Sequence, residues 1–202
     1  MVRQILISMS IGYGLGSIQS AYLLGQWVQK IDIREHGTGN AGASNVTSTM
    51  GLRYGVVVGA FDIFKGALSV VLVQAVFPGI PELAYLAGMM AVVGHLYPFY
   101  LRFRGGKGVA ALVGMMFGVD WRLGILFVLL VVVPALASDY IVVGSMTAFS
   151  ALPVLTYLQG HPPSLVGAAA LLAGISWYLH RENIQRILGG VELKISSVLF
   201  KR

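Results

Sequence analysis

Charged side chains are scarcer in this chain than a water-exposed surface normally allows. Asp, Glu, Lys and Arg make up 11% of its 202 residues, whereas hydrophobic residues make up 56%. A soluble domain usually carries about 25% charged residues, so most of the outer surface must face something other than water. The composition argues against a soluble enzyme, a disordered chain and a nucleic-acid binder, despite a formal net charge of +6. It predicts an all-α integral membrane protein.

Apolar segments long enough to cross a bilayer, which takes about 20 helical residues, recur along the chain. We expect spans near residues 5–28, 54–77, 82–101, 140–158 and 163–179. A further apolar block, residues 109–137, is interrupted at Asp120, and its two short legs form either two short spanning helices or a re-entrant hairpin. These segments predict one compact domain over residues 1–202, a bundle of seven transmembrane helices, two of them short.

Basic residues give this bundle an orientation, because the cytoplasmic loops of membrane proteins are enriched in Lys and Arg. With the N-terminus outside, nearly all of the 14 Lys and Arg residues fall on the inner side. Arg3 and Arg122 then lie outside, and Lys65 lies within a span. We therefore predict a multi-pass protein with its N-terminus out and its C-terminus in.

Small residues recur on single helix faces within the expected spans. Gly12 and Gly16 share one face of the first span, and Gly114 and Gly118 repeat at the same four-residue spacing. Small residues at this spacing let two helix backbones approach closely in a membrane. These faces are expected to contact protein rather than lipid.

The longest segment without apolar periodicity is residues 29–52, which includes Gly-Thr-Gly-Asn-Ala-Gly-Ala-Ser-Asn from Gly37 to Asn45. Loops of this length are usually functional or disordered, and this one lacks the composition of a disordered segment. Glycines, hydroxyls and amides suit a backbone that wraps around a polar ligand. The formal match to a dinucleotide-binding glycine motif is discounted, because no β-strand precedes it.

A second polar segment, residues 102–108, contains Gly105, Gly106, Lys107 and Gly108 directly before an apolar run. Glycines at a helix start can direct several N–H groups at an anion, and the helix dipole favours negative charge there. Lys107 adds a positive charge, so the segment has the properties of a phosphate cradle. The alternative is a tight turn whose basic residues contact lipid headgroups.

A third polar segment follows the last span and contains His180 and Asn183, which share a face if the helix continues. All three polar segments fall on the predicted inner side. Asp62 and Lys65 lie within a span, where ionisable residues have paired or functional roles. We expect a structural ion pair there, out of reach of the inner loops.

Several kinds of chemistry lack support in the sequence. There is no Gly-x-Ser-x-Gly nucleophile motif and no His-carboxylate grouping at metal-ligand spacing, so neither a metal nor a cofactor is predicted. Cysteine is absent, which excludes a thiol nucleophile. A phosphate-binding surface without an obvious base suits group transfer in which binding, orientation and charge stabilisation supply most of the rate.

The three motifs resemble those of the bacterial acyl-phosphate:glycerol-3-phosphate acyltransferases, the PlsY family. The first is Gly37-Thr38-Gly39-Asn40-x-Gly42-Ala43-Ser44-Asn45. The second runs from Gly94-His95-x-x-Pro98 to Gly105-Gly106-Lys107-Gly108-Val109-Ala110, and the third is His180-x-x-Asn183-Ile184-x-Arg186-Ile187-x-x-Gly190-x-Glu192. The likeness covers nearly the whole chain, with the motifs in the same order between corresponding spans.

The resemblance implies a seven-helix enzyme of the bacterial inner membrane with its active site facing the cytoplasm. It implies transfer of a fatty acyl group from acyl phosphate to glycerol 3-phosphate, giving lysophosphatidate and phosphate in phospholipid synthesis, with no obligate protein partner. It also implies catalytic roles for Lys107, His180 and Asn183. Substrate contacts are implied for Thr38, Asn40, Ser44, Asn45, Gly105, Gly106 and Gly108.

Several positions depart from the family pattern, which usually has arginine where this chain has Ser48 and Leu179. It also usually has threonine at the position of Ala111 and proline at the position of Gln19. Lys cannot reproduce the bidentate contact that arginine makes with phosphate, so Arg53 or Arg104 is expected to supply the missing charge. Two alternatives remain. One is a transporter-like or lipid-binding paralogue without catalysis, and the other is an acyltransferase for a different phosphorylated acceptor.

Overall fold

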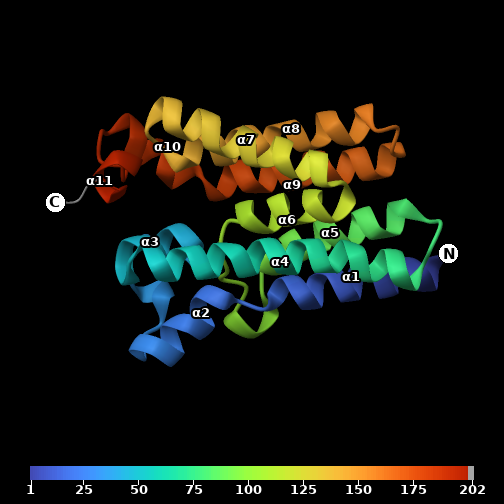
Figure 1. Ribbon diagram of the computed structural model, residues 1–202, viewed down its shortest axis with the longest axis horizontal. Helices are drawn as coiled ribbons and strands as arrows, with labels where there is room; N and C mark the ends of the chain where they lie inside the picture. Colours follow the sequence, from blue (N-terminus) through green and yellow to red (C-terminus); the bar gives the residue numbers. More distant parts are fainter. Residues whose placement is uncertain (200–202) are drawn as a thin grey trace. The chain divides into compact units, whose positions relative to one another are not determined.

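The computed structural model describes residues 1–199, which form helices and connecting turns with no β-strand in that range (Figure 1). The chain divides into two compact units, Met1–Gly124 and Ile125–Arg202. The helices of the first unit include α1 (Val2–Ser17), α2 (Ser20–Leu24), the π-helix η1 (Gly25–Gln29), the 3-10 turn η2 (Ile33–Glu35), α3 (Ala43–Met50), α4 (Leu52–Val76), α5 (Pro81–Leu96), the 3-10 turn η3 (Phe99–Leu101) and α6 (Val109–Val119). The all-α prediction is confirmed for these residues.

Glycines let α1 pack closely against α5. A Cβ atom on Gly12 would overlap the carbonyl oxygen of Ala87, and one on Gly16 would overlap that of Ala91. Both glycines are buried. The predicted protein-facing stripe of the first span is therefore confirmed.

Glycines also let α4 and α6 pack closely against each other. Gly66 on α4 lies against the backbone of Ala111, and Gly114 on α6 lies against the backbone of Ile63. A Cβ on Gly118 would stand 2.8 Å from the carbonyl oxygen of Ala67. The prediction that Gly114 and Gly118 mark a helix-packing face is confirmed.

The first predicted span, residues 5–28, is not one continuous helix. α1 ends at Ser17, and Ile18 has an extended backbone (φ −65°, ψ 106°) before α2 begins. The break frees two carbonyl oxygens, and side chains from elsewhere bind them. The Tyr100 hydroxyl donates to Ser17 O at 2.9 Å, and Lys65 Nζ donates to Ile18 O at 2.7 Å. These bonds replace the backbone bonds that a continuous helix would make.

The predicted interruption at Asp120 is present. α6 ends at Val119 and α7 (Trp121–Ser138) follows, with Asp120 in an extended conformation between them. The Asp120 carboxylate accepts a hydrogen bond from the Arg122 N–H at 2.7 Å, which satisfies one donor at the start of α7. The prediction of two short legs is wrong for the second, because α7 has 18 residues and extends about 27 Å.

The second unit holds most of α7, then α8 (Ile141–Leu158), α9 (Pro163–Leu179), α10 (Arg181–Leu188) and α11 (Ile195–Leu199). Trp177 Nε1 donates to Ser150 Oγ at 3.0 Å and joins α9 to α8. Asp139 accepts hydrogen bonds from the Ser196 hydroxyl and N–H, which join the α7–α8 connection to α11. The bond from the Ser196 hydroxyl holds the pKa of Asp139 below its usual value.

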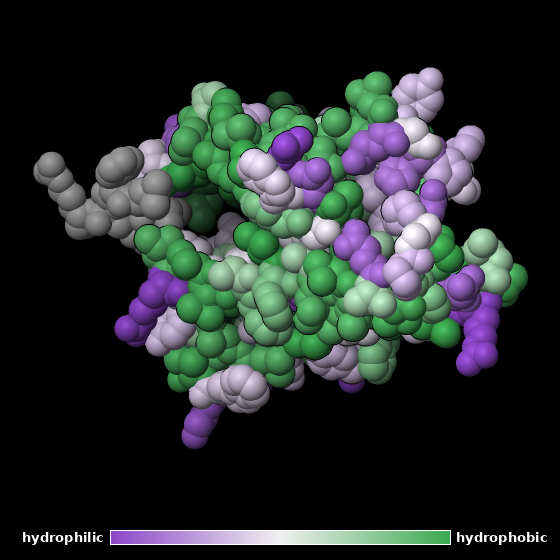
Figure 2. Space-filling model, turned by 45° about the vertical axis from the view of Figure 1, so that its right-hand side comes forward, coloured by the Kyte–Doolittle hydropathy of each residue, from purple (hydrophilic) through white to green (hydrophobic). Residues whose placement is uncertain are grey.

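Within the described residues, four helices are long and apolar enough to cross a membrane. They are Leu52–Val76, Pro81–Leu101, Trp121–Ser138 and Ile141–Leu158. α9 and α10 together would make a fifth, bent by 46°, and α6 is a shorter apolar helix. Apolar side chains cover broad areas of the face in Figure 2, as a lipid-facing surface requires.

Candidate active site

Asn45 organises the loop that precedes α3. Its side chain is fully buried, and its Oδ1 accepts a hydrogen bond from the Thr38 N–H at 2.8 Å. Its Nδ2 lies within hydrogen-bond distance of three carbonyl oxygens, those of Ile33 (2.9 Å), His36 (3.0 Å) and Asn40 (2.8 Å). Asn45 therefore folds the loop around itself, and it acts on any ligand through the backbone that it holds.

The predicted ligand-facing residues of the loop lie close together at its surface. Thr38 and Ser44 are exposed, and Asn40 Nδ2 donates to Thr38 Oγ1 at 2.9 Å. Gly37 has a positive φ of 59°, and a Cβ there would overlap Asn45 Oδ1. Glycine is needed at that position both for the backbone conformation and for the contact with Asn45.

The loop before α3 lies at the end of the first unit away from the N-terminus (Figure 1), and it is bonded to the connection between α5 and α6. Arg34 donates to Asp32 and also to Leu101 O at 2.8 Å. The Arg34 guanidinium lowers the pKa of the Asp32 carboxyl by donating hydrogen bonds to its charged form. Ala41 N–H donates to Gly105 O at 3.2 Å. The first two motifs are thus in direct contact.

Residues Gly105 to Gly108 form a turn before α6, the glycine turn. The N–H groups of Gly105 and Gly106 do not have the predicted anion-binding role. Gly105 N–H donates to Leu96 O and Gly106 N–H donates to His95 O, both at 3.1 Å, so these donors bind the end of α5 rather than an anion. A Cβ on Gly106 would stand 2.8 Å from Ala41 O and would overlap His95 Nε2. The glycines allow close approach of three segments.

Lys107 lies between this turn and the start of α6. Gly108 has a positive φ of 80° and is the residue that precedes the first turn of the helix. The first N–H groups of a helix have no acceptor within it, and the helix dipole places partial positive charge there. Lys107 therefore stands directly before a helix start that carries partial positive charge.

The two arginines proposed to replace the missing family charges differ in their surroundings. Arg104 is exposed and lies 3.8 Å from Glu35 of the loop. Arg53, at the start of α4, stacks over Tyr54 at 4.5 Å and donates to its hydroxyl at 2.9 Å. Exposed ion pairs contribute little binding energy, so the Glu35 contact leaves Arg104 able to exchange partners.

The third motif is arranged around Glu192 within the second unit. Asn183 Nδ2 donates to Glu192 Oε1 at 2.7 Å, and Arg186 Nε donates to Oε2 at 2.6 Å. His180 Nδ1 lies 2.8 Å from Ser176 O. A carbonyl oxygen only accepts, so His180 Nδ1 carries a proton and donates it to Ser176 O. Sequence reasoning gave Glu192 no role, although its place in the third motif indicated it.

A buried polar cluster in the first unit was also underestimated. Asp62 and Lys65 form the predicted ion pair, with Lys65 Nζ 2.8 Å from Asp62 Oδ1. Contrary to expectation, the pair is within reach of an inner loop. Lys65 Nζ lies 2.9 Å from His95 Nδ1, and the His95 carbonyl holds Gly106.

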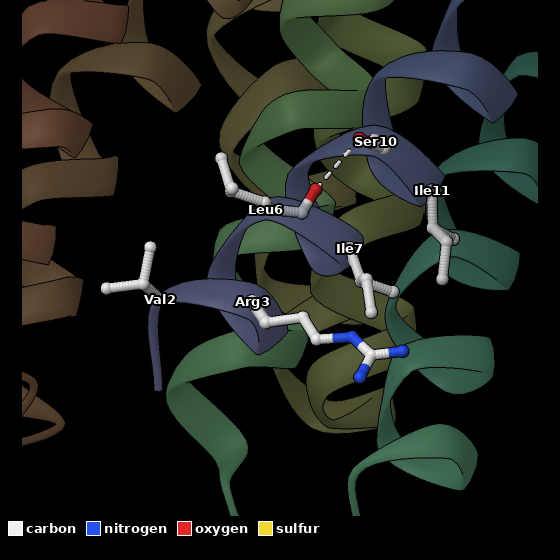
Figure 3. A pocket seen from close by; sticks show the side chains of 6 residues that line it. All are labelled: Val2, Arg3, Leu6, Ile7, Ser10 and Ile11. Atoms are coloured by element: carbon white, nitrogen blue, oxygen red, sulfur yellow. Dashed lines mark hydrogen bonds between the residues drawn. The ribbon is translucent and has the colours of Figure 1, made fainter.

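An open hollow of about 440 Å³ lies along the first half of α1, at the opposite end of the helix from its break. Its lining residues are Val2, Arg3, Leu6, Ile7, Ser10 and Ile11 (Figure 3). None of the predicted site residues lines it. The hollow is mainly apolar, and its position is separate from the polar loop and the glycine turn.

Comparisons with known proteins agree over nearly the full length. The family model described as glycerol-3-phosphate acyltransferase matches residues 6–190. A glycerol-3-phosphate acyltransferase of Thermotoga petrophila is 38% identical over 95% of this chain and 96% of its own length. Glycerol-3-phosphate acyltransferase 1 of Oceanobacillus iheyensis is 34% identical over 97% of each chain.

Two crystal structures of PlsY (YgiH), an integral membrane glycerol 3-phosphate acyltransferase, have the same fold. The glycerol 3-phosphate form superposes with a TM-score of 0.86 at 32% identity, covering 98% of this chain and 99% of the other. The lysophosphatidic acid form superposes with a TM-score of 0.82 at 31% identity and the same coverage.

Proposed function

The chain belongs to the glycerol-3-phosphate acyltransferase family, and we propose that it transfers a fatty acyl group from an acyl phosphate to glycerol 3-phosphate. It is an enzyme of phospholipid synthesis that produces lysophosphatidate, and it is an integral multi-pass membrane protein. The donor, the roles of single residues and the membrane orientation are the proposed parts.

The observation that carries the proposal is the contact between the polar loop and the glycine–lysine turn. The Ala41–Gly105 and Arg34–Leu101 hydrogen bonds bring Thr38, Asn40 and Ser44 to the segment that carries Lys107. Hydroxyls, amides, a lysine and a helix N-terminus are the groups that bind phosphate in proteins. Both proposed substrates are phosphorylated, so one positively charged surface serves both.

The transfer itself needs little from the protein beyond position and charge. A hydroxyl oxygen of glycerol 3-phosphate bonds to the carbonyl carbon of the acyl phosphate, and the bond from that carbon to the phosphate oxygen breaks. The phosphate leaves with the electron pair and takes up the hydroxyl proton. Lys107, Gly108 and the start of α6 stabilise the negative charge that develops on the departing phosphate.

The third motif supplies the remaining groups in this proposal. His180 and Asn183 orient the reacting groups, while Glu192 and Ser176 hold those two side chains in place. Thr38, Asn40, Ser44, Arg53 and Arg104 contact the substrates. Asn45, Gly105 and Gly106 shape the loop and the turn that present those contacts, and no metal or other cofactor takes part.

We propose seven transmembrane helices, with the N-terminus outside and the active site facing the cytoplasm of a bacterial inner membrane. Support comes from the distribution of Lys and Arg and from the contacts within each unit. The loop before α3 and the α5–α6 connection, both placed inside by charge, are hydrogen bonded. Asp139 and Ser196, also both placed inside, are hydrogen bonded as well.

The experiment is an assay of the purified protein in detergent with labelled acyl phosphate, acyl coenzyme A or acyl carrier protein as donor. Each donor is tested with glycerol 3-phosphate and with a panel of other phosphorylated acceptors. We expect labelled lysophosphatidate from acyl phosphate and glycerol 3-phosphate alone. Product from a thioester donor, or transfer to another acceptor only, would contradict the proposal.

Lys107→Ala tests the proposed site in the same assay. Loss of a preorganised group that stabilises charge typically lowers kcat by about 100- to 1000-fold, and we expect a loss of that size in a protein that still folds. The matched control is Arg122→Ala, which removes an exposed charge from the predicted outer side and is expected to leave transfer unchanged. Full activity of Lys107→Ala would end the assignment.

A further inference from the structure

The ion pair in the middle of α4 is bonded to α5 and to the α1 break rather than to water. Asp62 and Lys65 side chains are only 2% and 1% exposed. Taking two charges out of water costs several kcal/mol per ion, so a pair at this depth requires well-placed partners. Ser20 Oγ donates to Asp62 Oδ1 at 3.0 Å and supplies one of them.

The geometry around Lys65 fixes the protonation of His95. An ammonium has three N–H donors and no acceptor, and Lys65 Nζ has three acceptors. They are Asp62 Oδ1 at 2.8 Å, Ile18 O at 2.7 Å and His95 Nδ1 at 2.9 Å. Asp62 Oδ1 is 3.6 Å from Nδ1, too far for a hydrogen bond. Nδ1 therefore accepts from Lys65, and the neutral ring carries its proton on Nε2.

His95 contacts the glycine turn at two points. Its carbonyl oxygen accepts the Gly106 N–H at 3.1 Å, and its Nε2 edge lies where a Cβ on Gly106 would be. The His95 side chain is 4% exposed, so the ring is held on all sides. The residue after Gly106 is Lys107, and any shift of the ring moves the backbone that carries this lysine.

Gln19, at the break between α1 and α2, also binds the carbonyl oxygen of His95. Gln19 Nε2 donates to His95 O at 3.0 Å, and Gln19 N–H donates to the Tyr100 hydroxyl at 3.1 Å. Gln19 is fully buried, in a position where the resemblance leads one to expect proline. Gln19 at the break after α1 therefore helps to fix the His95 carbonyl oxygen, to which the glycine turn is hydrogen bonded.

We infer that Asp62, Lys65 and His95 form a positioning network that holds the Gly105–Lys107 turn in its reactive geometry. The inference rests on the proposed function, because it concerns the placement of Lys107. None of the three residues belongs to the proposed substrate contacts. A misplacement of about 1 Å can lower a rate by about 100-fold, which gives a buried network this close to the turn a measurable effect on catalysis.

The first test is independent of activity. The protein in detergent micelles is labelled with ¹⁵N-histidine, and the two ring nitrogens of His95 are assigned with a His95→Asn variant. We expect wild-type His95 to be neutral with its proton on Nε2. In Asp62→Asn/Lys65→Met, which replaces both buried charges together, Nδ1 loses its donor and a mixture of tautomers is expected. A charged ring or an Nδ1–H tautomer in the wild type would overturn the inference.

The second test separates positioning from binding. Asp62→Asn/Lys65→Met is expected to lower kcat by about 10- to 100-fold, with the KM for glycerol 3-phosphate within about threefold of wild type. Ser69→Ala on the same helix removes a buried hydroxyl that donates to Gly66 O at 2.7 Å. This control is expected to behave as wild type. An unchanged kcat in the double variant would overturn the inference.

Should the double variant fail to fold, single substitutions of His95 decide the matter. Glutamine places its amide nitrogen near the position of Nε2, beneath Gly106, whereas asparagine places its oxygen near Nδ1, facing Lys65. Support of the turn predicts a higher kcat for His95→Gln than for His95→Asn. The reverse order would mean that the ring serves only to solvate the ion pair. A wild type inactive with acyl phosphate but showing the Nε2–H tautomer would contradict the proposed function and leave the network supported.

Discussion

At the scale of single residues, much of the site consists of side chains that bind backbone rather than side chains that can bind a substrate. Asn45 contacts four backbone groups of its own loop. The carbonyl oxygen of His95 accepts hydrogen bonds from the Gly106 N–H and from Gln19 Nε2, and so holds the glycine turn. The residues left facing outward are short and polar, as in Thr38 and Ser44, or basic. Preorganised backbone of this kind loses little entropy when a ligand binds.

Asn45→Asp is predicted to destabilise the loop. The substitution keeps the acceptor for Thr38 N–H but replaces Nδ2, which faces three carbonyl oxygens, with an oxygen that repels them. Unsatisfied buried groups cost about 1–3 kcal/mol each, so we expect a lower Tm in detergent and a higher KM for glycerol 3-phosphate. Ser48→Ala, which removes an exposed hydroxyl bonded to Asn45 O, should change neither. An Asn45→Asp variant as stable as wild type would refute the role.

Arg53→Ala is predicted to raise the KM for glycerol 3-phosphate. Hydrogen bonds to charged groups contribute about 1.5–3 kcal/mol, so loss of a phosphate contact should raise KM by about tenfold or more. The variant also loses the stack on Tyr54, and Arg53→Lys keeps the charge as a comparison. If KM is unchanged for Arg53→Ala but raised for Arg104→Ala, Arg104 supplies the missing charge instead.

At the scale of helices, the sequence predicts what depends on composition and fails where the outcome depends on which helices pack together. The long apolar helices, the interruption at Asp120 and the glycine faces follow from residue type and spacing. The break after Ser17 does not, because its free carbonyls are satisfied by Lys65 and Tyr100 from distant segments. For the same reason, the connection from the ion pair through His95 to the turn was not predictable.

The glycine contact between α1 and α5 gives a prediction with an internal control. Gly16→Ala places a methyl group against the Ala91 backbone, and overpacking of this kind costs about 1–3 kcal/mol. At Gly14, two residues away on the same helix, no heavy atom lies within 4 Å of the position that a methyl group would take. Gly14→Ala should therefore leave the Tm unchanged or slightly higher. Equal effects of the two variants would contradict the packing.

At the scale of the whole molecule, hydrogen bonds within each unit join polar connections that are far apart in the sequence. In the first unit these are the loop before α3 and the α5–α6 turn, and in the second they are the α7–α8 connection and the start of α11. These contacts agree with the distribution of Lys and Arg, from which we propose that the connections face the inner side of the membrane. An enzyme that acts on soluble phosphorylated compounds at the bilayer surface needs its polar binding groups to face the water on one side of the membrane.

The absence of cysteine makes the orientation directly testable. Single cysteines at Glu35, Gln159 and Gln185, all exposed, are treated in intact cells with a membrane-impermeant maleimide. The account predicts labelling of Gln159→Cys only, with Glu35→Cys and Gln185→Cys labelled after the membrane is opened. Labelling of Glu35→Cys and Gln185→Cys from opposite sides would contradict the topology.

The proposal that Lys107 and His180 both take part in the transfer is tested most directly by a double-mutant cycle in kcat/KM. Lys107→Ala, His180→Ala and the double variant are assayed with acyl phosphate and glycerol 3-phosphate beside the wild type. Residues that act as a unit in catalysis are strongly non-additive, so the double variant should be about as impaired as the worse single variant. A loss in the double variant equal to the product of the two single losses would show that Lys107 and His180 act independently, and would contradict the account.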